Sequence, residues 1–278
     1  MAGPLTQTTG LKILSETVSA EVEYGVNASR GLIPAIWDTG EQFFGPGYKV
    51  HIPIIATVAG AAFTTGALTF TNNTDTEIVT TPTVAYSAIQ IEEPLLIPAV
   101  ADPVKLYAPA LAEGIYQKID VDGLALYAGY TTNDKTDAAD FTEATFQSLV
   151  STMLTNGGDK VMPGQLTGFY HPAKWDAIFQ LGNFTNAAVR GEGAGPAKTG
   201  VIGMAYGVNF VFTSNVATST TIRNLILAKK AMVLVRKNRP KIEMERTDLS
   251  TKVVASMMYG IVVGHEKAGG VHRITTTT

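Results

Sequence analysis

The sequence contains no cysteine among its 278 residues, and only 16% of its residues carry a charge. The absence of cysteine excludes disulfides, zinc–thiolate sites and cysteine nucleophiles. The charged fraction is well below the ~25% of an ordinary soluble domain. Because the cores of protein interfaces are depleted in charge, this composition predicts a subunit that hides much of its surface against partners.

Threonine and glycine take the place of the missing charge, with 35 and 27 residues. The net charge of −3 provides no overall basic field that would attract nucleic acid. The longest stretch without a charged side chain, residues 50–74, exceeds the length of a membrane span, but threonines and asparagines interrupt it. We therefore predict no membrane partner.

Helical periodicity appears in several segments. Apolar residues at spacings of three and four predict an amphipathic helix or a partly helical arm over residues 11–29. Asp102 and Pro103 suit the N-cap and the first turn of a long helix that continues towards Leu126. Phe141–Leu154 is predicted as a second helix, and its inward side chains are Phe146, Leu149, Val150 and Met153. A glycine- and proline-rich stretch, 31–47, is predicted as an extended connector, and residues 129–140 as a polar linker.

Strands are predicted at residues 48–55 and 84–91, with ten threonines from position 57 to position 83. These features predict a long β-hairpin that closes on the 84–91 strand. The hairpin has too few large apolar residues for a core of its own, so it must lie on another surface. The last quarter returns to strand at 225–228, 232–236, 241–246 and 253–264. This order is neither a βαβ repeat nor a β-sandwich, and it predicts an α+β fold.

No catalytic or metal-binding pattern is present in the sequence. The four histidines, none spaced as a ligand pair, are predicted to be ordinary surface or interface residues: His51, His171, His265 and His272. The loop GEGAGPAKTG (191–200) lacks the glycine that a phosphate-binding loop needs directly before Lys198. We therefore predict no catalytic residue, no cofactor and no metal, and we do not expect an enzyme.

Eight of the 21 basic residues fall within residues 223–246. They are Arg223, Lys229, Lys230, Arg236, Lys237, Arg239, Lys241 and Arg246. Three interpretations remain open: contact with neighbouring subunits, weak and salt-sensitive contact with nucleic acid, or a solvated strand-turn. The candidate intersubunit contacts are Phe63 and Phe70 in the hairpin, and Arg236, Lys237, Arg239 and Lys241 in this cluster.

The order of the elements resembles the major capsid proteins of tailed phages with the HK97 fold, over nearly the whole chain. GYKVHIPI (47–54), VAYSAIQIEEP (84–94) and the threonine-rich stretch between them look like that family's extended E-loop. Residues 103–129 look like its long spine helix. GFYHPAKWDAIFQLGNF (168–184) and residues 200–216 look like its axial domain, and residues 241–274 look like its closing peripheral-domain sheet.

The resemblance implies four parts: an N-terminal arm (1–36), the E-loop β-hairpin region (37–94), a peripheral domain (95–130 and 223–278) and an axial α/β domain (131–222). It further implies self-assembly into hexamers and pentamers of an icosahedral head around double-stranded DNA. We expect assembly in the host cytoplasm and a place in the virion. A separate scaffolding protein is expected because no scaffold-like segment precedes the arm, and a portal and a decoration or cement protein are further expected partners. Encapsulins, which are protein compartments of the same fold, are the alternative, and a glycine-loop enzyme is a more distant one.

Some members of this family join subunits by an isopeptide bond between an E-loop lysine and an asparagine. Here no lysine occurs between Lys49 and Lys105, so the hairpin has no amine to offer. We therefore predict a shell that is held together by non-covalent contacts.

Overall fold

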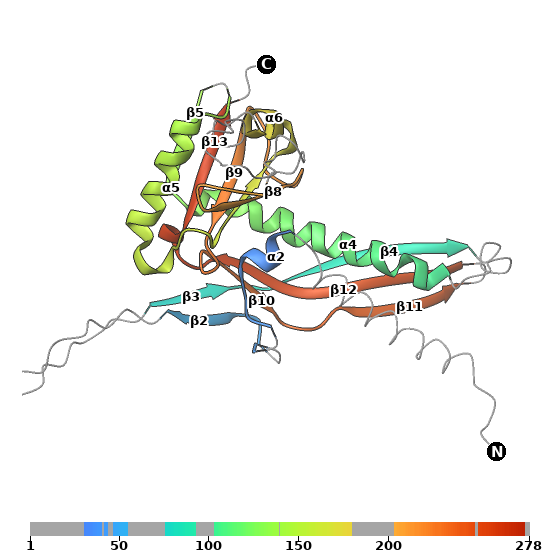
Figure 1. Cartoon of the computed structure of the whole chain (residues 1–278). Coiled ribbons are helices and arrows are strands. Elements are labelled where there is room, and N and C mark those ends of the chain that lie inside the picture. The colour runs from blue at the N-terminus through green and yellow to red at the C-terminus, as the bar shows by residue number, and fades with distance from the viewer. Residues whose placement is uncertain are drawn as a thin grey trace, which may run out of the picture.

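The computed structural model describes residues 31–40, 42–43, 47–54, 76–92, 103–138, 140–179, 203–247 and 250–275. Within these residues the chain forms an elongated part, an upright part and a projecting hairpin (Figure 1). The elongated part contains a five-stranded sheet, and the upright part contains a six-stranded sheet. The predicted α+β fold is confirmed.

A five-stranded sheet covered on one face by the long helix α4 (Pro103–Leu124) makes up the elongated part. Its strands are β1 (Trp37–Asp38), β10 (Met232–Arg236), β12 (Ser250–Val263), β11 (Lys241–Thr247) and β4 (Thr83–Glu92). β4 pairs with one edge of β12, and β10 and β11 follow one another along the other edge. Leu111, Ile115 and Ile119 of α4 lie four residues apart, on one face of the helix, and they are buried where α4 packs on this sheet.

The predicted long helix is confirmed, and it continues into the short helix η1 (Ala125–Gly129). Gly114 explains how α4 approaches the sheet so closely. A Cβ atom at this position would lie 2.6 Å from the Oγ atom of Ser87 in β4. A side chain here would therefore push the helix away from the strand.

Six strands form the sheet of the upright part. In spatial order they are β5 (Asp134–Asp137), β13 (Gly269–Thr275), β9 (Thr221–Leu227), β6 (Leu166–Tyr170), β8 (Val208–Phe212) and β7 (Met204–Ala205). Helix α5 (Glu143–Gly157) packs against β5 and β13. The shorter helices are η2 (Gly158–Lys160), η3 (Pro172–Lys174), α6 (Trp175–Phe179) and η4 (Glu266–Ala268). All four side chains predicted to face inwards from α5 are buried.

The projecting hairpin pairs β2 (Val50–Ile54) with β3 (Thr76–Thr80), with Val50 opposite Thr80. Ile52 packs with Val233 and Val235 of β10, so the base of the hairpin lies on the five-stranded sheet. The predicted strand 84–91 is confirmed as β4, but its predicted place in the hairpin was wrong, because β4 pairs with β12 and the hairpin closes on β3. Both candidate strands are extended and rich in β-branched or apolar residues, and only the burial of one face of β4 under α4 selects the pairing.

Two segments predicted to be irregular contain regular elements. The connector 31–47 includes α2 (Leu32–Ala35) as well as β1, because Leu32 packs against α4 at Gly123. The linker 129–140 includes β5, a polar strand at the sheet edge that pairs with β13. A charged edge strand has no apolar alternation, which is why its sequence did not reveal it.

The strand pairing also crosses the predicted boundary at residue 223. β9 pairs with β13 on one side and with β6 on the other, so both β9 and β13 belong to the sheet of the upright part. β10, β11 and β12 belong to the elongated part. The segment 223–278, predicted as wholly peripheral, is therefore divided between the two sheets, since short apolar runs do not specify which sheet they join.

Candidate assembly surfaces

Clusters of metal-binding side chains are the first kind of site to consider in the part of the chain that the structure describes. No group of three or more histidine, aspartate or glutamate side chains there could hold a metal ion. None of the described helices is both long and apolar enough to cross a membrane. The glycine-rich loop 191–200 lies outside the described residues. The surfaces that remain to be considered are those that could contact other molecules.

The basic cluster contains a wide β-bulge. Arg236 pairs with Tyr259 and Lys241 pairs with Ser256, so the four residues 237–240 face only two residues of β12. The side-chain Oδ1 of Asn238 accepts a hydrogen bond of 2.6 Å from the backbone N–H of Met258. This amide therefore replaces a carbonyl that the bulge removes from the ladder, and residues 237–240 project from a sheet edge rather than from a free turn.

The four predicted contact residues of this cluster lie in different surroundings. Arg236 is buried and forms an ion pair with Asp38 of β1. Lys241 is exposed and pairs with Glu243 at 2.8 Å. Lys237 is half-buried and Arg239 is exposed. Lys237, Arg239 and Lys241 thus lie in one accessible region. Arg236, in contrast, is buried and its partner belongs to the same chain.

Phe63 and Phe70 lie outside the described residues, so their predicted contacts stay predictions. Near the same hairpin, Tyr48 is 69% exposed immediately before β2. Val79, on β3, is also exposed. These side chains extend the apolar character of the hairpin to its described base.

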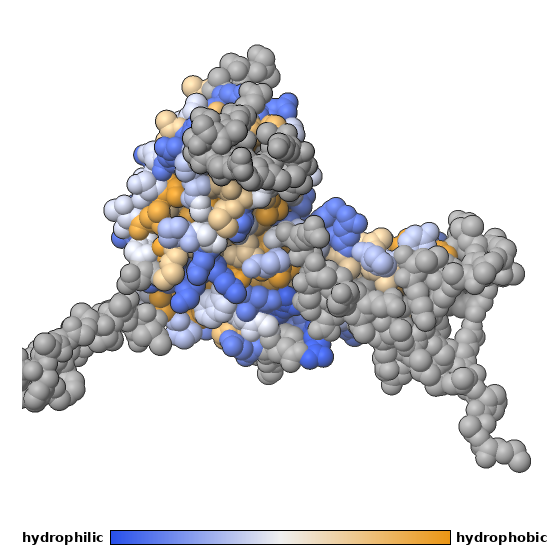
Figure 2. All heavy atoms as spheres, in the orientation of Figure 1, coloured by the Kyte–Doolittle hydropathy of each residue, from blue (hydrophilic) through white to orange (hydrophobic). Residues whose placement is uncertain are grey.

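The face of the five-stranded sheet opposite α4 carries a second set of exposed apolar side chains. Val84 and Tyr86 of β4 are 60% and 73% exposed, whereas Ala85 and Ile91, which alternate with them, are buried. Met258 of β12 is paired with Val84 and adds to the same face. In the view of Figure 2, hydrophobic residues reach the surface of both the upright part and the elongated part. Neighbouring exposed apolar side chains of this kind suit an interaction surface.

A buried carboxylate connects three parts of the chain. Asp120 of α4 is fully buried, and its Oδ1 accepts a 2.9 Å hydrogen bond from the backbone N–H of Leu32. Its Oδ2 accepts one of 3.4 Å from Asn215, in the upright part. Burial raises the pKa of Asp120 above its usual range, although the hydrogen bonds from Tyr116, Leu32 and Asn215 oppose the shift. Asp120 therefore holds the start of the described chain between the two sheets.

His272 was predicted to be a surface or interface histidine, and this prediction was wrong. It is fully buried, and its Nε2 lies 2.8 Å from Oδ2 of Asp137 while its Nδ1 lies 3.1 Å from the hydroxyl of Tyr170. Nε2–H therefore donates to the carboxylate, and the Tyr170 hydroxyl donates to Nδ1. Burial lowers the pKa of His272, and the Asp137 charge opposes that shift. The sequence offered no signal for this network because β5, β6 and β13 contribute one residue each.

Comparisons with known proteins identify the fold. No protein-family model matches the chain, and no curated protein matches it either. Among solved structures, the capsid of cyanophage P-SCSP1u matches with a TM-score of 0.67 and 15% identity, over 89% of each chain. The mature capsid of bacteriophage PhiM1 matches with a TM-score of 0.63 and 12% identity, over 90% of this chain and 89% of that one. A virus-like particle from Pyrococcus furiosus matches with a TM-score of 0.61 and 13% identity, over 93% of this chain and 99% of the other.

These matches extend over nearly the whole chain, so they compare the complete arrangement of sheets and helices rather than one motif. The chain has the HK97-like fold of capsid-shell subunits, as its order of elements predicted.

Proposed function

We propose that this protein is the major capsid protein of a tailed double-stranded DNA phage. In this proposal, hexamers and pentamers of the chain build an icosahedral head. The observation that carries the proposal is the match to the cyanophage capsid over 89% of both chains. The low charge and the exposed apolar face at Val84 and Tyr86 support it independently, because both features suit a subunit whose surface is covered by its neighbours.

Copies of the chain are the principal partners, and the arm (1–36) and the E-loop region (37–94) lie across neighbouring subunits. Phe63 and Phe70 contribute apolar contacts there, and Lys237, Arg239 and Lys241 contribute polar ones. The subunits assemble in the host cytoplasm with a separate scaffolding protein and a portal, and the mature shell takes up a decoration or cement protein. The shell encloses DNA that the subunits contact weakly, and the chain acts as a structural protein and not as an enzyme.

A protein compartment that encloses protein instead of DNA is the second candidate. The observation that supports it is the match to a virus-like particle from Pyrococcus furiosus over 99% of that chain, because this neighbour is named as a particle and not as a phage capsid. Phage capsids and this particle share one architecture, so the enclosed material distinguishes the two candidates and the fold does not.

The test is expression of the full chain, alone and with the proteins encoded beside it, followed by electron microscopy and light scattering. We expect closed shells, with nuclease-protected DNA in particles from infected cells. Protein cargo in place of DNA would favour the compartment, and a stable monomer under every condition would contradict both candidates.

A matched variant tests which surface assembles. Tyr86→Glu places a charge on the exposed face of β4, where the subunit alone loses little because the side chain is already in water. We expect shells to disappear while the unfolding midpoint of the subunit stays the same. Normal shells from this variant would exclude the β4 face as a contact surface.

A further inference from the structure

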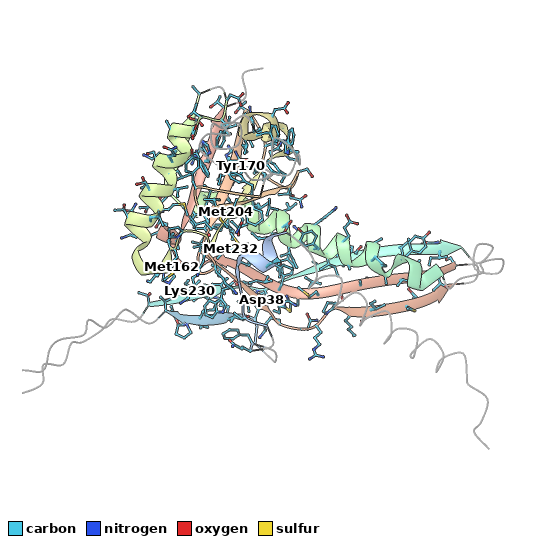
Figure 3. All side chains as sticks on the ribbon, viewed as in Figure 1. Asp38, Met162, Tyr170, Met204, Lys230 and Met232 are labelled. Carbon is cyan, nitrogen blue, oxygen red and sulfur yellow. The ribbon has the colours of Figure 1, made fainter. Side chains whose placement is uncertain are left out.

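A cavity of about 360 Å³ opens at the end of the upright part where α5 terminates. The end of α5, the helix η2 and the helix η4 form its wall, with Asn156, Gly157, Lys160, His265, Glu266 and Lys267 among its lining residues. Lys230, in the turn between β9 and β10, lies beside His265 in a smaller neighbouring pocket that Ile52 and Ile78 of the hairpin also line. Figure 3 shows Lys230 in this turn, close to the hairpin.

The cavity gathers positive charge that the described part of the chain does not neutralise. Lys160, Lys230 and Lys267 are exposed, and none of them forms an ion pair with a described residue. Glu266 is the one acidic lining residue, and its carboxylate accepts hydrogen bonds of 2.7 Å from the hydroxyls of both Thr131 and Thr132. Two lining lysines, the nearby Lys230 and one carboxylate that already accepts hydrogen bonds leave a net positive charge at the cavity.

The pKa of His265 responds to this positive charge. Burial lowers the pKa of His265, and the positive charges of Lys160 and Lys230 lower it further. Its imidazole therefore faces two lysines from two different elements, with Lys267 and Glu266 following it on η4. No hydrogen bond of this ring to a described residue is present, so both ring nitrogens remain available within this region.

Part of the lysine cluster has a simpler cause. The carbonyl end of α5 attracts cations, which favours Lys160 and Lys267 at Gly157. This effect does not account for Lys230, which comes from a different turn, or for a histidine placed between the lysines. Several like charges around one concave surface repel each other, and an anion in the cavity removes that repulsion.

We propose that this cavity binds a phosphate group through Lys160, Lys267 and His265, and that Lys230, in the adjoining pocket, adds positive charge beside His265. Ammonium groups bind phosphate as point charges, and a protonated imidazole adds an N–H donor. The phosphate comes either from a nucleic-acid backbone or from the free ion, and the chemistry of recognition is the same. The inference does not require the proposed capsid function, because a subunit that never assembles still contains the cavity.

Binding and protonation of His265 are coupled. An anion beside the ring favours the imidazolium, so phosphate raises the pKa of His265, and by reciprocity phosphate binds more tightly as the pH falls through that pKa. Binding to a DNA backbone weakens steeply with added salt, whereas binding of the free ion competes only with other anions.

The experiment follows the His265 ring by NMR in the full-length, unassembled protein. The protein is titrated with inorganic phosphate, and separately with a 12-base-pair DNA duplex, each at constant ionic strength against a chloride control. We expect an upward shift in the pKa of His265 with at least one of the two. A shift with the duplex alone indicates a backbone site, and a shift with inorganic phosphate alone indicates a site for the free ion.

Lysine variants decide whether the cavity is responsible. Lys160→Gln and Lys267→Gln should each weaken binding by roughly threefold to tenfold, because each removes one screened charge contact. Lys252→Gln is the matched control, since Lys252 is also exposed but lies at the other end of β12. Absence of any shift with both ligands, or equal binding by all three variants, would overturn the proposal. Particle formation is measured separately, so failure to assemble leaves this result interpretable.

Discussion

Asp38 in β1 and Arg236 in β10 form an ion pair between residues 198 positions apart in the sequence. The pair is supported by backbone contacts at the same place: the N–H of Thr39 donates to the carbonyl of Leu234 at 3.0 Å. The Arg236 side chain is 9% exposed and that of Asp38 is 25% exposed. The contact therefore fixes the segment that follows the predicted arm onto the edge of the five-stranded sheet.

Asp38→Asn should destabilise the subunit strongly, because it removes the carboxylate that forms an ion pair with a nearly buried guanidinium. We expect the free energy of unfolding to fall by about 2–4 kcal/mol, as measured by urea unfolding of unassembled protein. Glu243→Gln is the matched control, because it removes a carboxylate from the exposed pair with Lys241. That variant should unfold at the wild-type urea concentration. Equal effects of the two changes would show that the Asp38–Arg236 contact does not stabilise the fold.

The buried network of His272, Asp137 and Tyr170 should make the upright part sensitive to acid. Burial depresses the pKa of His272 in the folded chain. The pKa of Asp137 is also lowered, because hydrogen bonds from Thr145, Thr142 and His272 outweigh the opposing effect of burial. For both groups the unfolded chain binds protons more readily, so stability is lost as the pH falls, beginning near the unfolded histidine value of about 6.5.

His272→Gln should therefore lower stability at pH 7.5 but reduce the further loss between pH 7.5 and pH 5. Urea unfolding at several pH values measures this slope. Tyr170→Phe, which keeps the ring and removes the hydroxyl, provides a milder variant if His272→Gln does not fold. His51→Gln, which makes the same substitution at an exposed histidine, serves as the control for unspecific effects. A slope identical to wild type in His272→Gln would mean that His272 does not govern acid stability.

Much of the helical structure could be predicted because its signals are local. The inward face of α5 follows from the spacing of Phe146, Leu149, Val150 and Met153, and burial confirms all four. Such patterns depend only on residues within a few turns of one another. The whole-length order of the elements was equally readable, and it led to the fold that the comparisons show.

The choice of strand partners could not be read in the same way. Residues 76–80 and 84–91 are both extended, and only the long-range contact of β4 with α4 and β12 assigns them to different sheets. Arg236 presented the same problem, since nothing near it in sequence indicates Asp38 as its partner. Tyr86 could have been recognised as a candidate contact residue, because successive residues of a strand point to opposite faces and its neighbour Ala85 is buried.

Charge reversal in the basic cluster should separate its two proposed roles. Because Arg236 is committed to Asp38, the informative variant is the double change Arg239→Glu and Lys241→Glu. If these residues contact neighbouring subunits, we expect fewer shells by electron microscopy from subunits whose circular dichroism is unchanged. Normal shells that retain less DNA would instead favour contact with nucleic acid, with a salt dependence that weakens in the variant.

Boiling the shells in denaturing detergent should release a single band near 29.5 kDa. The reason is the absence of any lysine between Lys49 and Lys105, which leaves the hairpin without an amine nucleophile. A wild-type sample kept unheated in mild detergent serves as the control for intact particles. A ladder of covalent multimers after boiling would contradict the prediction that non-covalent contacts alone hold the shell.

Protease digestion tests the predicted placement of the hairpin between subunits. Trypsin has no site from His51 to Val104, because neither lysine nor arginine occurs there, so an aromatic-directed protease is required. Phe63 and Phe70 lie in a stretch with too few large apolar residues to build its own core, and we expect chymotrypsin to cut there rapidly in unassembled protein. In shells, contacts with neighbours should protect the same sites, with each buried aromatic side chain adding ~1.5–3 kcal/mol to the cost of exposing it.

Mass spectrometry of the fragments identifies the cut positions, and cutting within the buried strand β6 serves as the reference for a site closed in both states. Equal rates of cutting at Phe63 and Phe70 in subunits and in shells would mean that this hairpin does not carry the contacts between subunits.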